Sequence, residues 1–270
     1  KIYYKNKYSH VYILDKVNKP AIAAKLSGIK NIIGPGIGNQ KKWLTVKNFL
    51  TTQDANLNYS EQSQKILRIN SISINNIYPE ININLERFRS GNPDLEIKGR
   101  KIAFGIDSFE DYKMWYEEDF VKLADKLYEK KLFDYIYLLC GKEKSYLADN
   151  IIKLSNKNFF INCSNKDLNG IIYALKNSSF LVGNNSGPIN LGAALGVKSF
   201  GLIANDPVEE LQYSKIKIIT PDNYSNIRCR ERVGMKKLTV DKVFNKIMED
   251  LNQWKHQILH YHPQTIKISI

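Results

Sequence analysis

The chain has 270 residues, a formal net charge of +13 at pH 7, 43% hydrophobic residues and 11% aromatic residues. At roughly 150 residues per domain, this length predicts two domains or one large one. The apolar content excludes a disordered basic tail, and three widely spaced cysteines without a C-x-x-C pair indicate neither a disulfide framework nor a zinc site. The sequence shows no long uncharged apolar run typical of a membrane span.

Strand and helix signals alternate at the start of the chain, an order typical of α/β proteins. The expected elements are a strand over residues 11–14, a helix over 20–26, a strand over 30–33 and a helix over 59–67. The loop from Gly34 to Gly38 is interpreted as a turn, because no G-x-G-x-x-G spacing fits it. Asp15 follows a strand, where it either caps the next helix or faces a cleft.

The alternation is more regular after the turn-rich stretch from Arg89 to Gly99, which is the predicted domain boundary. Strands are expected over 101–105, 135–140, 159–162, 180–183 and 198–203, with helices over 117–130, 147–154, 168–176, 188–195 and 239–251. Such alternation predicts a doubly wound parallel sheet whose ligands bind at the carboxyl ends of the strands. We expect residues 1–95 to form a partial N-terminal domain, 96–251 a second domain and 252–270 a tail.

The sequence GNNSGPINLGAALG combines the features of a helix that begins directly after a strand. The strand ends at Gly183, and Asn185 and Ser186 precede the predicted helix. Pro188 suits its first turn and Gly196 suits its end. The unpaired N–H groups and the positive dipole end of such a helix favour phosphate binding. The alternative is an ordinary capped turn whose small residues only allow close packing on the sheet.

This segment, with the strand after it and Asp206-Pro207, resembles the signature loop of glycosyltransferase family 9, the lipopolysaccharide heptosyltransferase family. The family pattern is roughly G-N-D-[ST]-G-x-x-H-L-A-A-A-L-G. Three other segments resemble family segments: residues 108–120 (K-x-W-x-x-E-x-[FW]), residues 139–143 (strand, glycine, acidic residue) and residues 9–34 (Y-D-x-x-I-D through L-x-G-x-x-x-x-I-G). The resemblance covers most of residues 8–251.

The resemblance implies an α/β fold of GT-B type, with two Rossmann-like domains of which the N-terminal one is incomplete here. The family's first strand, turn, helix and second strand, roughly sixty residues against an ordinary domain of about 150, have no counterpart. The function implied is transfer of a sugar, a heptose in the family, from a nucleoside-diphosphate donor to a lipopolysaccharide-type or other lipid-linked saccharide. The implied reaction uses no metal and no cofactor, and takes place in bacteria at the cytoplasmic face of the inner membrane.

The resemblance also assigns nucleotide-sugar-binding residues. It implies that Lys113 neutralises the diphosphate, that Ser108 donates to it and that Glu143 binds the ribose. The residues that face the diphosphate are Asn185, Ser186, Gly187 and Asn190. A leaving nucleoside diphosphate gains negative charge in the transition state, and an ammonium with fixed N–H donors stabilises that charge.

The chain departs from the family pattern at two positions of the motif. Asn185 stands where the family has Asp, and Asn190 stands where it has His. An amide keeps hydrogen-bonding capacity but brings no charge. The family's catalytic base is usually an aspartate in the N-terminal segment without a counterpart here, so no residue of this chain is assigned that role. A catalytically inactive or truncated nucleotide-sugar-binding relative is therefore the alternative function.

The remaining charged residues give weaker signals. A basic segment could contact phosphorylated lipid or a membrane surface peripherally, the alternative being a solvated surface; its residues are Arg228, Cys229, Arg230, Glu231, Arg232, Lys236 and Lys237. Nucleic-acid binding would rest on net charge alone, because no recognisable nucleic-acid motif is present, and no nucleic-acid partner is expected. His256, His260 and His262 do not cluster with acidic residues, and helical i,i+4 spacing would let them chelate a metal; they are interpreted instead as part of the tail, so no metal site is expected.

Overall fold

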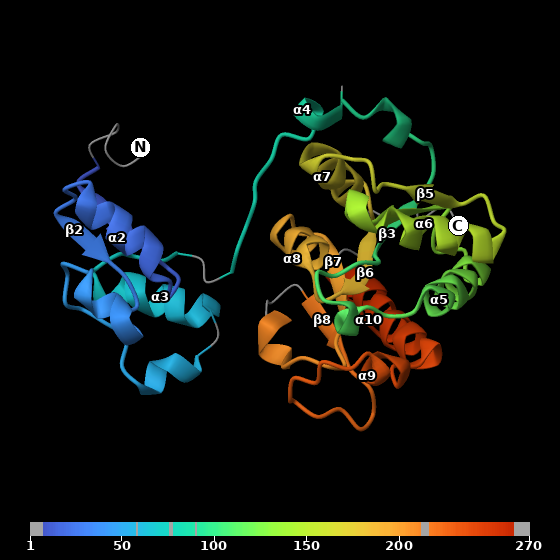
Figure 1. The fold of residues 1–270 in the computed structure, drawn as a ribbon. Coiled ribbons are helices and arrows are strands. Elements are labelled where there is room, and N and C mark those ends of the chain that lie inside the picture. Colours follow the sequence, from blue (N-terminus) through green and yellow to red (C-terminus); the bar gives the residue numbers. More distant parts are fainter. Residues whose placement is uncertain (1–7, 58, 76–77, 90, 212–215, 262–270) are drawn as a thin grey trace. The chain divides into compact units, whose positions relative to one another are not determined.

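The computed structural model describes residues 8–57, 59–75, 78–89, 91–211 and 216–261, with the backbone alone for 55, 56, 59, 210 and 254–261. The chain divides into two compact units, here called unit 1 (Lys1–Pro79) and unit 2 (Glu80–Ile270) (Figure 1). Each unit has buried hydrophobic clusters of its own. None of the described helices is both long and apolar enough to cross a membrane.

Unit 1 is built on a strand–helix–strand motif. Its elements are β1 (His10–Tyr12), α2 (Asn18–Leu26), β2 (Asn31–Ile33) and α3 (Tyr59–Ile69), with short 3₁₀ helices at Gly38–Lys42 and Gln53–Asn56. The two strands are parallel, with Val11 opposite Ile32. Gly28 ends α2 at a φ of +75°, a conformation that glycine adopts at little cost.

A buried glutamine fixes the glycine loop after β2. The Gln40 side chain accepts from the Gly36 N–H (3.0 Å) and donates to the backbone carbonyls of Asp15 (2.7 Å) and Val17 (2.9 Å). Gly36 itself has a φ of +68°. The loop is thus a turn held by hydrogen bonds to Gln40. Asp15 is exposed and does not cap α2, whose N-cap is Val17.

Unit 2 contains a six-stranded sheet in which all paired strands are parallel. The strands, in the order in which they lie in the sheet, are β5 (Phe160–Asn162), β4 (Tyr135–Leu139), β3 (Lys101–Gly105), β6 (Phe180–Asn184), β7 (Lys198–Leu202) and β8 (Ile216–Ile219). The chain enters the sheet in the middle, proceeds outward to β5, and then returns to the other side of β3. This strand order is that of the doubly wound folds that bind dinucleotides. The sequence predicted a doubly wound parallel sheet.

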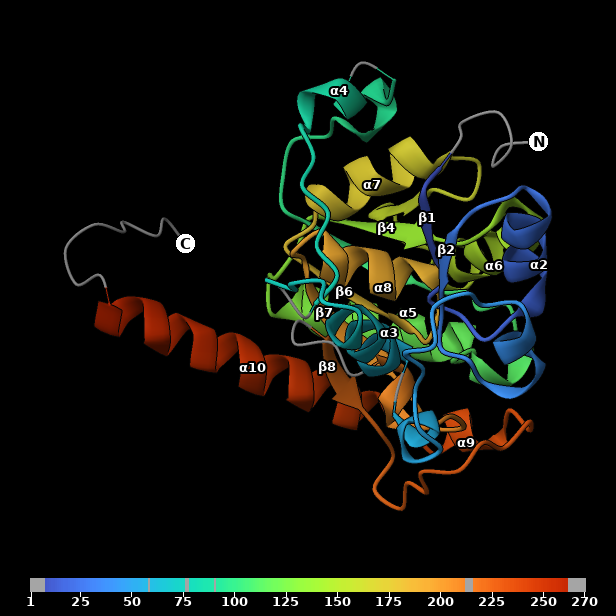
Figure 2. The same cartoon turned by 90° about the vertical axis from the view of Figure 1, so that its left-hand side faces the viewer.

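The helices of unit 2 cover both faces of this sheet. They are α4 (Glu86–Arg89), α5 (Glu117–Glu129), α6 (Ser145–Ser155), α7 (Leu168–Lys176), α8 (Gly187–Ala194), α9 (Val233–Lys236) and α10 (Val240–Tyr261), with 3₁₀ helices at Pro93–Leu95, Asp111–Lys113, Lys142–Lys144 and Val208–Leu211. In Figures 1 and 2, α7 and α8 lie on one face and α5 on the other.

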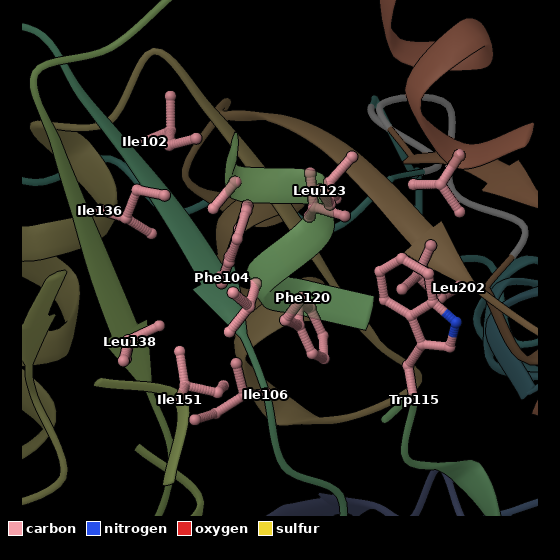
Figure 3. Close-up of a cluster of buried hydrophobic side chains, with 14 of the residues drawn as sticks. Ile102, Phe104, Ile106, Trp115, Phe120, Leu123, Ile136, Leu138, Ile151 and Leu202 are labelled. Atoms are coloured by element: carbon pink, nitrogen blue, oxygen red, sulfur yellow. The ribbon is translucent and has the colours of Figure 1, made fainter. Parts of the chain in front are cut away.

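Alternate side chains of each strand therefore enter different clusters. Ile102 and Phe104 of β3 pack with residues of α5, α6 and α10, whereas Ala103 between them packs with residues of α7 and α8. Figure 3 shows the first cluster, where Phe104 points toward Phe120 and Leu123 of α5. Strands buried on both faces explain why the sequence of unit 2 shows nearly continuous apolar runs.

The division of the chain into two units falls between Pro79 and Glu80, earlier in the sequence than the boundary expected at residues 95 and 96. The reason is long-range packing, because Ile83, Leu85 and Phe88 lie against the cluster formed with α7 and α8. At the other end, α10 continues to Tyr261, so helical backbone extends into the segment expected to be a tail (Figure 2). Residues 262–270, including His262, lie outside the described residues, as do the side chains of His256 and His260.

Candidate nucleotide-sugar site

The candidate site lies where the strand order of unit 2 reverses, between β3 and β6. The connections from these neighbouring strands go in opposite directions, which opens a crevice at their carboxyl ends. Gly105 and Gly183 are paired in register at this point. A Cβ on Gly183 would lie 3.0 Å from the Gly105 Cα, so the two backbones approach more closely than a side chain allows.

The turn from β6 into α8 has hydrogen-bonding capacity that the protein does not use. Ser186 is the N-cap residue with an extended backbone, yet no described side chain caps the helix. The Ser186 hydroxyl is buried and makes no hydrogen bond in the described structure, and the same is true of Asn190 Oδ1. Asn190 Nδ2 donates to the Ser186 carbonyl at 3.0 Å. Buried polar atoms without partners are costly, so this turn is suited to a polar ligand or ordered water.

The connection after β3, residues 106–116, is held against the end of β6. Asn184 is fully buried; its Oδ1 accepts from the Trp115 N–H and its Nδ2 donates to the Ile106 carbonyl, both at 2.9 Å. The buried Ser108 hydroxyl donates to the Asn185 carbonyl at 3.1 Å. The structure thus brings Ser108 to the predicted phosphate turn.

Lys113 lies in the same connection and is paired with acidic side chains. Its Nζ is 3.2 Å from Asp206 Oδ2 and 2.9 Å from Glu110 Oε2. Asp206 follows β7 and also pairs with Arg228, whose Nε lies 3.0 Å from Oδ1. Asn205 Nδ2 donates to the Tyr112 carbonyl at 2.7 Å, which ties the connection to the end of β7. Lys113 is therefore held at the carboxyl edge of the sheet, against the residues that follow β7.

A second lysine stabilises the near end of this connection. Lys144 Nζ donates to the Ser108 carbonyl (2.8 Å) and pairs with Asp111 (2.7 Å). Glu143, next to it in the 3₁₀ helix after β4, is exposed. The hydrogen bond from Lys113 is the largest influence lowering the pKa of Glu110, and the one from Lys144 has the same effect on the pKa of Asp111.

An open cavity of about 660 Å³ lies beside the turn. Its lining comes from the carboxyl ends of β3, β4 and β5 and from the starts of α7 and α8; the residues are Asp107, Leu139, Cys140, Gly141, Lys142, Ser164, Asn165, Lys166, Asp167, Leu168, Ile171, Gly187, Pro188 and Leu191. Gly187 is thus the predicted site residue in this lining, whereas Glu143 is not part of it. The Ser164 hydroxyl is buried and has no hydrogen-bond partner in the described structure.

The cavity is suited to binding rather than to thiol chemistry. Burial raises the pKa of the Cys140 thiol to about 12 and has the same effect at Cys163, so neither is a nucleophile near neutral pH. Among the described residues, no group of three or more His, Cys, Asp or Glu side chains could hold a metal ion. The side chains that line the cavity include hydroxyl and amide groups together with the charged Asp107, Lys142, Lys166 and Asp167.

Two important residues were not predicted as part of the site. The sequence assigns Asn184 no role beyond its place in the motif, although its side chain joins the end of β6 to both ends of the connection after β3. Asp206 was noted in the Asp206-Pro207 pair without a role, and its pairing with Lys113 spans many residues of sequence. The resemblance of the surrounding segments to the family pattern is the signal in the sequence that indicates Asn184 and Asp206, because the residues that they contact are distant in the chain.

The chain is similar to a known protein family in sequence and to several solved structures in fold. The model of "Glycosyltransferase family 9 (heptosyltransferase)" matches residues 61–238. The structure of ADP-heptose lipopolysaccharide heptosyltransferase II from E. coli is 14% identical, with a TM-score of 0.75 over 93% of this chain and 79% of that chain. No curated protein sequence gives a significant match.

Two further solved structures are similar. E. coli heptosyltransferase WaaC with ADP is 16% identical, with a TM-score of 0.67 over 90% of this chain and 72% of that chain. A family 9 glycosyl transferase from Veillonella parvula is also 16% identical, with a TM-score of 0.68 over 90% and 74%. The matches confirm the expected fold class, an α/β structure with parallel sheets that matches GT-B heptosyltransferases.

Proposed function

The chain belongs to glycosyltransferase family 9, and from this premise we propose that it transfers a sugar from a nucleoside diphosphate to a lipid-linked saccharide. The proposed sugar is a heptose and the proposed acceptor is of lipopolysaccharide type. The observation that carries the proposal is the β6–α8 turn. In the described structure no side chain caps the N–H groups at the start of α8, and the buried Ser186 hydroxyl has no hydrogen-bond partner.

The proposed donor site uses residues of unit 2. The diphosphate contacts Asn185, Ser186, Gly187 and Asn190 at the turn. Lys113 neutralises its charge and Ser108 donates a hydrogen bond, which requires its hydroxyl to turn from the Asn185 carbonyl. Glu143 binds the ribose; its exposed position after β4, close to the cavity lining at Gly141 and Lys142, is compatible with this role.

The proposed chemistry is displacement at the anomeric carbon without a metal ion. As the bond to the sugar breaks, negative charge accumulates on the leaving diphosphate, and fixed donors stabilise that charge most in the transition state. The N-terminus of α8 and the Lys113 ammonium supply such donors. No residue is proposed as the base that activates the acceptor hydroxyl.

A second candidate is a protein that binds nucleotide-sugar without transferring it. The observation that favours it is the pair of amides, Asn185 and Asn190, at positions where the family pattern has Asp and His. Amides preserve hydrogen bonds but not a charge or a proton-transfer group. Donor binding is therefore common to both candidates, and turnover separates them.

Two measurements test the proposal. Calorimetric titration with ADP, GDP and UDP is expected to give heat with at least one nucleotide, and ADP is the first choice because similar structures contain it. Incubation with ADP-heptose and a lipid-linked saccharide, with and without EDTA, is expected to release ADP equally in both. Binding without release would favour the second candidate, and no binding of any nucleotide would refute both.

We also propose that the protein contacts the cytoplasmic face of a bacterial inner membrane peripherally through its basic segment. Arg230, Lys236 and Lys237 are exposed there, together with Ile227 (70% exposed) and Val233 (51%). Cations interspersed with apolar side chains favour anionic lipid surfaces. Co-sedimentation with phosphatidylglycerol vesicles, but not phosphatidylcholine vesicles, is expected, and loss of this binding in K236E/K237E would locate it.

A further inference from the structure

The Lys113 ammonium contacts two carboxylates that differ in burial. Asp206 is 2% exposed and lies 3.2 Å from Lys113 Nζ, whereas the Glu110 side chain is 42% exposed and lies 2.9 Å away. The Lys113 side chain itself is only 10% exposed. One ammonium is therefore held from inside the protein by one carboxylate and from the solvent side by another.

Asp206 is a fixed partner. Its second oxygen pairs with Arg228 Nε at 3.0 Å, and its backbone carbonyl accepts a hydrogen bond from the Tyr224 hydroxyl. A buried carboxylate that loses one of its two cationic partners keeps only part of the compensation for its charge, which is costly. The pairing with Lys113 is consequently difficult to break.

Glu110 is an exchangeable partner. It lies three residues before Lys113 in the same connection, and exposed ion pairs of this kind contribute little stability because water competes for both charges. The hydrogen bond from Lys113 lowers the pKa of Glu110, so the side chain is an anion at neutral pH. An anion with more charge and more acceptor oxygens can replace it.

The position of the connection that carries Lys113 indicates which anion could replace Glu110. Two tethers flank it in sequence: Ser108 contacts the Asn185 carbonyl and Trp115 contacts the Asn184 side chain. The connection that carries Lys113 is thus fixed next to the turn at which we place the diphosphate. Glu110 provides the negative charge on the solvent side of Lys113, and Asp206 provides the one on the inner side.

We propose that Asp206 is a positioning residue that holds the Lys113 ammonium at the β6–α8 turn, and that Glu110 is a placeholder anion that the diphosphate displaces. This inference rests on the proposed function. It predicts opposite effects for two substitutions that each remove one negative charge next to the same lysine. If the two carboxylates acted only through their negative charge, removing either one would strengthen the binding of an anion.

The test compares affinities for ADP and for adenosine in the full-length protein by calorimetry. Asp206→Asn is expected to weaken ADP binding about 3- to 10-fold, and Glu110→Gln to strengthen it about 2- to 5-fold, the scale of single charged contacts. Adenosine has no phosphate, so its affinity is expected to stay constant in both. Asp206→Glu restores the carboxylate and is expected to bind ADP within about twofold of the unaltered protein.

Asp111→Asn is the matched control for Glu110→Gln. Asp111 is the next residue in the chain and pairs with Lys144 instead of Lys113, so this variant removes the same charge without freeing Lys113. Equal strengthening in both variants, or a shift in the same direction for Glu110→Gln and Asp206→Asn, would overturn the inference while leaving the proposed function intact. If Asp206→Asn does not fold, the comparison of Glu110→Gln with Asp111→Asn decides. No ADP binding by the unaltered protein would overturn the proposed function and this inference together.

Discussion

Two amide side chains, Asn184 and Asn190, lie at the two ends of the β6–α8 turn, and their contacts differ. Asn184 is fully buried and joins the Ile106 carbonyl to the Trp115 N–H, which makes it a structural residue. Asn190 donates to the Ser186 carbonyl and keeps a buried oxygen without a partner in the described structure. Because amides are neutral, the positive charge of the proposed site comes from Lys113 and from the helix N-terminus.

The neutrality of Asn190 predicts how donor binding depends on pH. In the unaltered protein, ADP affinity is expected to be nearly constant between about pH 5.5 and 8, apart from the titration of the phosphate itself. Asn190→His introduces an imidazole with an unperturbed pKa of about 6.5, which is protonated at the acidic end. The variant is therefore expected to bind ADP more tightly as the pH falls.

Calorimetric titrations of both proteins across this pH range separate the side chain from the ligand, because the phosphate titrates equally in both. Identical pH profiles would mean that residue 190 does not approach the diphosphate. The assignment of Asn190 to the site would then be wrong at that position.

At the scale of elements, the close approach of β3 and β6 depends on two facing glycines. A Cβ at Gly183 would lie 3.0 Å from backbone atoms of Gly105, and backbone cannot rotate away as a side chain can. Gly183→Ala is expected to lower the stability of unit 2 by about 1–3 kcal/mol, the usual cost of overpacking a tight core. Gly187→Ala is the control, since a Cβ there meets no atom within 4 Å.

Urea denaturation followed by circular dichroism measures both variants. Gly187→Ala is expected to unfold near the urea concentration of the unaltered protein, and Gly183→Ala at a lower one. Equal midpoints would show that the two strands can separate at no cost.

The sequence predicted most elements of unit 2 because buried parallel strands and amphipathic helices leave clear patterns. β3 and α7 have the expected bounds, whereas β8 was not predicted, because four residues at the sheet edge give a weak signal. The packing of Phe88 on unit 2 and the pairing of Lys113 with Asp206 could not be predicted either. Both join residues that are distant in sequence, and composition and periodicity report only on near neighbours.

At the scale of the whole molecule, the two units differ in the size of their cores. The buried members of the unit 1 clusters are Ile, Leu and Ala side chains, among them Ile32 and Ile66, whereas the larger clusters of unit 2 contain several aromatic residues. Unit 1 relies in part on polar contacts. Asp54 is buried there, and hydrogen bonds from Lys65 and Thr51 lower its pKa to about 2.

The direction of this shift determines how acid affects unit 1. The pKa of Asp54 in the folded unit is below its ordinary value of 3.8. The stabilisation is therefore fully present above pH 4 and is lost as the pH falls from about 4 to about 2. Asp54→Asn removes the carboxylate at every pH, so the variant is expected to lack this part of the acid sensitivity.

Separate cores and a donor site built from unit 2 residues predict two thermal transitions with different sensitivities. At pH 7, scanning calorimetry is expected to show unit 1 unfolding first because its core is smaller. Asp54→Asn is expected to lower only that first transition. ADP at 100 times its dissociation constant stabilises the unit that binds it by about 2.7 kcal/mol, so it is expected to raise only the second. The two effects should be additive when variant and nucleotide are combined, because each is expected to act on a different unit. A single transition that both perturbations move would instead mean that the units unfold as one cooperative body, and that the stability of the donor site depends on Asp54.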